Sequence, residues 1–118
     1  MKRILIVDDA AFMRVAIRNI VVKHGFTVVG EAANGVAAVE QYALLKPDIV
    51  TMDITMPEMN GIDALAEIRR MDSQAVVVMV SALGQESMVR DAVRAGAKGF
   101  VVKPFKEETI IAALTKLA

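Results

Sequence analysis

The sequence contains no cysteine and only one histidine, His24. The lack of cysteine excludes disulfide bonds, thiol nucleophiles and cysteine-based zinc sites, and a single histidine excludes a histidine-rich metal site. Neither sign of charge prevails, because 14 basic residues balance 14 acidic ones. Such a balance gives the chain no attraction for nucleic acid or for an anionic membrane. We therefore expect no nucleic acid and no membrane among its partners.

Long apolar runs are absent too, although 55% of the residues are hydrophobic. No segment approaches the ~18 consecutive apolar residues of a membrane-spanning helix. The first three residues lead directly into a short apolar run, without the features of a secretory signal. We expect a cytoplasmic monomer with a single domain over residues 1–118, because this length holds one core and leaves no room for an output domain.

What the chain does contain is a regular alternation of short apolar runs and helix-like segments. The runs cover residues 4–7, 27–30, 49–52, 75–80 and 100–102, and the helix-like segments cover residues 12–23, 36–45, 62–68, 85–95 and 106–117. This alternation predicts an α/β fold, in which helices cover both faces of a doubly wound parallel sheet.

Polar side chains follow four of the five runs. Asp8 and Asp9 come after the first, Asp53 after the third, Ser81 after the fourth and Lys103 after the fifth. The carboxyl ends of parallel strands meet at one edge of a sheet, so these side chains are expected to converge. Three carboxylates in one place repel one another, and a hard divalent cation such as Mg²⁺ relieves that repulsion. The pattern predicts a site for a metal and a phosphate.

Each of these residues also has a simpler interpretation. An aspartate between a strand and a helix is often the N-cap of the helix, which is the commoner outcome for Asp8 and Asp9 taken alone. Ser81 fits a helix cap, Asp53 a turn, and Lys103 a surface position before a proline that starts a helix. Whether the peptide bond that follows Lys103 is cis stays open.

Asp53 is the candidate nucleophile. Beside a metal, its carboxylate is able to attack phosphorus and form an aspartyl phosphate. Lys103 would supply a positive charge to the phosphoryl oxygens, and Ser81 a hydrogen bond. Phe100 lies within the last apolar run and, taken alone, is a core residue.

These residues resemble the receiver domain of two-component response regulators, over the whole span from Ile4 to Leu117. Residues 48–61 are particularly similar to magnesium-dependent chemotaxis members of that family. The resemblance implies a flavodoxin-like (βα)5 fold with a five-stranded sheet in the order 2-1-3-4-5. It rests on Val7-Asp8-Asp9, Asp53 with Met56-Pro57 and Gly61, Ser81-Ala82, and Lys103-Pro104-Phe105.

The resemblance also implies a freestanding signalling protein whose only catalysis is on itself. In family members, the residue at position 53 accepts a phosphoryl group from a histidine kinase of the chemotaxis type. By the same resemblance, Asp8, Asp9, Asp53 and the backbone carbonyl of Thr55 would hold Mg²⁺, and Lys103 and Ser81 would bind the phosphoryl oxygens.

A switch is implied as well. Ser81 moves towards the phosphate, the aromatic residue Phe100 turns inward, and the surface of the fourth helix, fifth strand and fifth helix changes. A flagellar motor switch protein would then read that surface.

Two departures from the family pattern carry expectations. Phe100 stands where chemotaxis members often have tyrosine, so a hydroxyl is absent. Thr55 and Leu83 occupy positions that help to orient the hydrolytic water, and Leu83 has no polar group. We expect slow self-dephosphorylation and a separate phosphatase.

Other functions make different demands on the same positions. A receiver of another two-component pathway, such as a phosphorelay shuttle or a fragment of a larger regulator, would share the same site. An aspartate-nucleophile phosphatase would need an acid where Thr55 stands. A flavodoxin-like electron carrier would need a phosphate loop where Asp8 and Asp9 stand.

Overall fold

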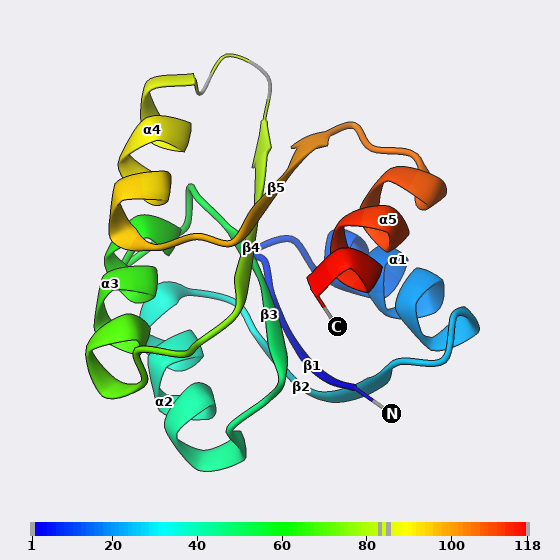
Figure 1. Cartoon of the computed structure of the whole chain (residues 1–118), viewed down its shortest axis with the longest axis horizontal. Helices are drawn as coiled ribbons and strands as arrows, with labels where there is room; N and C mark the ends of the chain where they lie inside the picture. Colours follow the sequence, from blue (N-terminus) through cyan, green and yellow to red (C-terminus); the bar gives the residue numbers. More distant parts are fainter. Residues whose placement is uncertain (1, 83, 85, 118) are drawn as a thin grey trace.

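The computed structural model describes residues 2–82, 84 and 86–117, which form alternating strands and helices (Figure 1). The elements in chain order are β1 (Arg3–Val7), α1 (Ala11–Lys23), β2 (Thr27–Ala32), α2 (Gly35–Leu45), β3 (Ile49–Asp53), α3 (Gly61–Met71), β4 (Val77–Ala82), α4 (Glu86–Ala95), β5 (Gly99–Lys103) and α5 (Glu107–Leu117).

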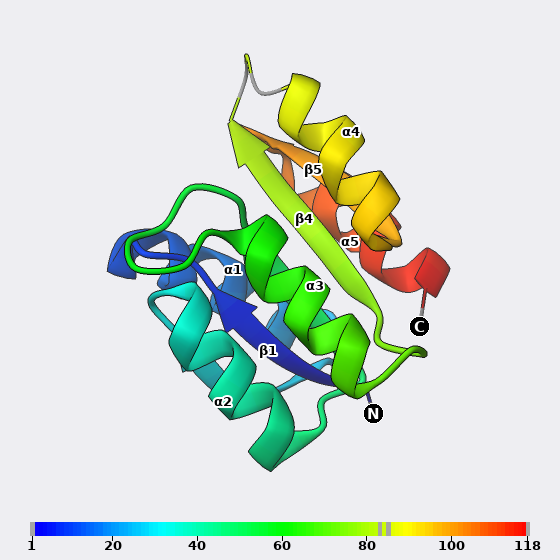
Figure 2. The same ribbon diagram turned by 90° about the vertical axis from the view of Figure 1, so that its left-hand side faces the viewer.

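The five strands pair in parallel in the order β2-β1-β3-β4-β5, which confirms the predicted α/β fold and its strand order. Helices α1 and α5 cover one face, and α2, α3 and α4 cover the other (Figure 1). Figure 2 shows the second face, where α3 lies between α2 and α4. The order reverses between β1 and β3, and this is the place where open parallel sheets bind ligands.

Two hydrophobic layers hold the sheet between the helices. Along β1, Leu5 and Val7 enter the layer under α2, α3 and α4, whereas Ile4 and Ile6 enter the layer under α1 and α5. A strand with both faces buried needs apolar residues at every position, because successive side chains point to opposite faces. This is why the strands appear in the sequence as continuous apolar runs.

The fourth strand corrects one predicted boundary. The sequence predicts a strand over residues 75–80, but β4 covers Val77–Ala82. The amide of Ala75 donates to the carbonyl of Asp72, so this residue still belongs to the turn after α3. The shift of two residues places Ser81 inside the strand instead of after it.

Asparagine side chains start two of the helices that face the site. The side chain of Asn34 accepts a hydrogen bond from the amide of Ala37 at the start of α2, and Asn60 accepts one from the amide of Asp63 at the start of α3. Both are N-caps, which satisfy amides that have no partner within the helix. Within the described part of the chain, none of the helices has the length and apolar character to cross a membrane.

Candidate functional site

The turn after β1 supplies two carboxylates, and neither caps the helix that follows. Asp8 is only 1% exposed, and its Oδ1 accepts a hydrogen bond from the amide of Ala10 at 2.9 Å. The N-cap of α1 is Ala10, without a side-chain hydrogen bond. The interpretation of Asp8 or Asp9 as the N-cap is therefore wrong, and both carboxylates remain available to the edge of the sheet.

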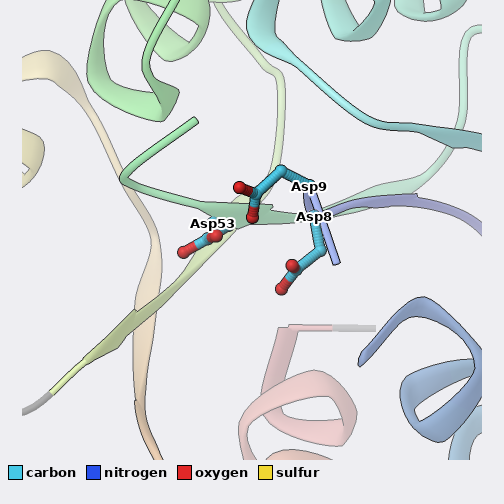
Figure 3. Close-up of side chains that lie close together, drawn as sticks. All are labelled: Asp8, Asp9 and Asp53. Atoms are coloured by element: carbon cyan, nitrogen blue, oxygen red, sulfur yellow. The ribbon is translucent and has the colours of Figure 1, made fainter. Parts of the chain in front are cut away.

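Asp53 joins this pair from β3, of which it is the last residue. Asp53 is buried, with 7% of the residue exposed, whereas Asp9 is exposed. One carboxylate oxygen from each of Asp8, Asp9 and Asp53 lies within 4.8 Å of the other two (Figure 3). The structure thus brings the three acids together, as the strand ends predict.

Lys103 completes the cluster as the last residue of β5. Its Nζ donates to Asp8 Oδ2 at 2.9 Å and lies 3.5 Å from Asp53 Oδ1. The Lys103–Pro104 peptide bond is cis, which answers the question that the sequence leaves open. Three carboxylates and one ammonium group leave about two negative charges in excess when all are ionised, because a single cation cannot balance three anions.

The surroundings of the cluster change the pKa values of Asp53 and Lys103. Burial and the neighbouring charge of Asp8 raise the pKa of Asp53 to about 6, although the ammonium group of Lys103 acts in the opposite direction. Burial alone would lower the pKa of Lys103, but its hydrogen bond to Asp8 and the charge of Asp53 raise it. Asp53 is therefore ionised at neutral pH at an energetic cost, and a cation would remove that cost.

The donor set fits Mg²⁺. This ion prefers oxygen ligands and binds through a few carboxylates while it keeps several waters and substrate oxygens. Asp8, Asp9 and Asp53 offer such oxygens from two neighbouring strands, and the excess negative charge matches a divalent cation. Thr55 lies two residues beyond Asp53, in the loop that leads to α3, with its side chain exposed.

The other predicted residues lie on the neighbouring strands. Ser81 is 1% exposed and pairs with Val102 in the ladder between β4 and β5, so its interpretation as a helix cap is wrong. Phe100 pairs with Met79 and packs, partly buried, against the layer under α2, α3 and α4. Leu83 lies outside the described residues.

Sequence reasoning missed two features that fix the cluster in place. The guanidinium of Arg14 donates to the backbone carbonyl of Asp8 at 2.7 Å. Gly61, the first residue of α3, packs so closely on the carbonyl of Asp53 that a Cβ atom would overlap it. The positions of Arg14 and Arg18 on one helical face were the available signal for the first feature, but spacing along a helix does not reveal a contact with backbone.

The chain matches the response regulator receiver domain family over residues 4–115. It therefore belongs to this family. It is 58% identical to the chemotaxis protein CheY of Thermotoga maritima over 99% of this chain and 98% of that protein. It is 61% identical to CheY of Bacillus subtilis over 97% and 95% of the two chains.

A solved structure agrees with the sequence comparisons. The crystal structure of the CheX-CheY-BeF3-Mg²⁺ complex from Borrelia burgdorferi contains a chain with 40% identity, which superposes with a TM-score of 0.94 and covers 98% of this chain and 88% of that one. Together the comparisons identify a receiver domain of the type found in CheY chemotaxis response regulators, which are signalling proteins.

Proposed function

We propose that residues 1–118 act as one receiver domain, a phosphorylation switch in which Asp53 accepts a phosphoryl group from a histidine kinase of the chemotaxis type. The observation that carries the proposal is the cluster of Asp8, Asp9 and Asp53 beside Lys103 at the carboxyl edge of the sheet. A nucleophilic carboxylate, an acidic metal site and a cation in one place are what phosphoryl transfer requires.

In the proposed reaction, an oxygen of Asp53 attacks phosphorus. The bond between phosphorus and the donor histidine nitrogen breaks, and its electron pair stays on the imidazole. Lys103 and Ser81 bind the phosphoryl oxygens, and Mg²⁺, held by Asp8, Asp9, Asp53 and the carbonyl of Thr55, would neutralise charge on them. The relative solved with BeF3 and Mg²⁺ supports a magnesium site here.

The output follows from the same site. Ser81 approaches the phosphoryl group, Phe100 turns inward, and the surface of α4, β5 and α5 changes. We propose that a flagellar motor switch protein reads this surface in the cytoplasm, that the protein is a monomer, and that a separate phosphatase ends the signal. The similarity to chemotaxis proteins favours this pathway over another two-component pathway.

Phosphate incorporation tests the central step. Wild-type protein and the Asp53→Asn variant are incubated with a small acyl phosphate, with and without Mg²⁺, and the added phosphoryl mass is measured on the intact chain. We expect magnesium-dependent labelling of wild type and none in the variant. Asp63→Asn is the matched control, because Asp63 is an exposed carboxylate in the first turn of α3. Labelling that persists in Asp53→Asn would move the acceptor elsewhere.

A further inference from the structure

Arg14 connects α1 to both β2 and the turn that carries the acidic cluster. Its side chain is 19% exposed, its Nη1 donates to the carbonyl of Asp8 at 2.7 Å, and its Nε lies 3.1 Å from Glu31 Oε1. Glu31 lies in β2 and also accepts hydrogen bonds from Arg18. The hydrogen bond from Arg18 lowers the pKa of Glu31 most, and the bond from Arg14 lowers it further. Glu31 is therefore ionised at neutral pH and pairs with both guanidinium groups.

The bond from Arg14 is one of several that hold Asp8. The amide of Asp8 donates to the carbonyl of Ala32, its Oδ1 accepts from the amide of Ala10, and its Oδ2 accepts from Lys103. The backbone carbonyl of Asp8 accepts the hydrogen bond from Arg14. The peptide unit that joins Asp8 to Asp9 includes this carbonyl, so the contact fixes the direction in which the chain enters the second aspartate.

We propose that Arg14, anchored by Glu31, is a positioning residue that preorganises Asp8 and Asp9 for a divalent cation. This inference rests on the proposed magnesium site and names a further residue on which its affinity depends. Without the contact, the mutual repulsion of the carboxylates would turn the Asp8–Asp9 segment away from Asp53. Partners that hold metal ligands in place typically change metal affinity by about 10-fold or more when they are removed.

Arg18 provides a matched control on the same helix. It binds the same Glu31 one turn further along α1, with its Nε 2.8 Å from Oε2. Among the described residues, its side chain hydrogen-bonds Glu31 and no group of the turn after β1. Arg14→Met and Arg18→Met each remove one guanidinium from Glu31 and keep an unbranched apolar side chain. Only Arg14→Met removes the bond to the carbonyl of Asp8.

The experiment is a calorimetric Mg²⁺ titration of the folded variants. We expect Arg14→Met to weaken Mg²⁺ binding about 10-fold and Arg18→Met to change it less than about twofold. At saturating Mg²⁺, the rate of labelling by an acyl phosphate should return to near the wild-type value in Arg14→Met, because Arg14 does not touch the reacting atoms. Equal affinity in Arg14→Met and wild type, or equal losses in both arginine variants, would overturn the proposal.

A second readout does not need the metal. Hydrogen exchange of the Ala10 amide, which bonds to Asp8 Oδ1, should accelerate about 10-fold in metal-free Arg14→Met and stay unchanged in Arg18→Met. If wild type binds no Mg²⁺, the proposed metal site fails, while this exchange rate still tests whether Arg14 holds the turn.

Glu31→Gln replaces Arg14→Met as the test variant if Arg14→Met does not fold. We expect exchange of the Ala10 amide to accelerate by about threefold in Glu31→Gln, because the glutamine side chain still accepts a hydrogen bond but carries no charge. An unchanged rate in the folded variant would contradict the proposal.

Discussion

Polar groups at the two edges of the sheet have opposite electrostatic surroundings. At the amino edge, the guanidinium of Arg3 donates to the carbonyls of Leu45 and Lys46 at the C-terminal end of α2, and the backbone amide of Arg3 donates to Asp48. The hydroxyl of Tyr42 donates to Asp72 at 2.8 Å and joins α2 to α3. Each of these charges meets a complementary group, and the bond from Tyr42 lowers the pKa of Asp72.

At the carboxyl edge, like charges gather instead. Among the described residues, Lys103 is the one cation paired with the cluster of Asp8, Asp9 and Asp53. Burial and the charge of Asp8 raise the pKa of Asp53 to about 6. The amino edge thus contributes to folding, whereas the acidic cluster at the carboxyl edge costs folding energy that a bound cation would offset. Such conflicts concentrate at functional sites, because a ligand relieves them.

The largest expected effect is on stability, and it comes from replacing one glycine at each edge of the sheet by alanine. Gly61→Ala at the carboxyl edge should lower the free energy of unfolding by about 3 kcal/mol or more, because its Cβ would overlap the backbone carbonyl of Asp53, which cannot move aside. Gly25→Ala at the amino edge should cost about 1 kcal/mol, because Gly25 has a φ of +91° but open space around it. Urea unfolding measures both, and equal losses would contradict the close packing at Gly61.

A smaller effect is expected from Asp53→Asn, which should raise the free energy of unfolding instead of lowering it. Its folded-state pKa lies above the unfolded value, so the ionised carboxylate destabilises the metal-free protein, and this cost grows as the pH rises from about 4 through 6. The shift corresponds to about 3 kcal/mol, which solvent screening reduces, so we expect Asp53→Asn to add about 1–2 kcal/mol at pH 7.5.

The same variant should gain little at pH 4, where the carboxyl group of Asp53 is protonated in the folded protein and still partly protonated in the unfolded chain. Thermal unfolding in a chelator at the two pH values gives the comparison. A loss of stability at pH 7.5 would show that Asp53 supports the fold as the amino-edge groups do.

Magnesium affinity should depend on pH through the same group. The ligand must be deprotonated, so protons compete with the metal below a pKa of about 6. We expect the apparent affinity to be nearly constant above pH 7 and to fall towards tenfold per unit below pH 6. Calorimetric titrations from pH 5 to 8 measure this, and a flat profile would place the metal away from Asp53.

The smallest expected effect is a change in melting temperature caused by a substitution at the amino edge. Tyr42→Phe removes the bond to Asp72 and should lower the melting temperature by about 4 °C. Because this bond lies far from the acidic cluster, the deficit should be the same with and without saturating Mg²⁺. A deficit that Mg²⁺ abolishes would show that the two edges are coupled.

Much of the fold could be predicted from the sequence, because the buried strands impose a local pattern. Five apolar runs predict five strands, and the strand ends predict which acids converge with Lys103. The fourth strand was predicted to start two residues too early because Ala75 and Val76 are apolar, although Ala75 still belongs to the turn after α3. The strand order came from the resemblance to a family and not from the pattern.

The sequence by itself determined the alternation of elements and the residue types at the carboxyl edge, since a strand that is buried on both faces is a local run of apolar residues. Only the tertiary structure decided the geometry and electrostatics of the site. Asp8 and Lys103 are 95 positions apart, yet their charged atoms lie 2.9 Å apart. The contacts of Arg14 and Gly61 are made with backbone carbonyls, which every residue carries. Because every residue has a backbone carbonyl, the sequence does not indicate which carbonyl a side chain will contact, and only the folded structure shows it.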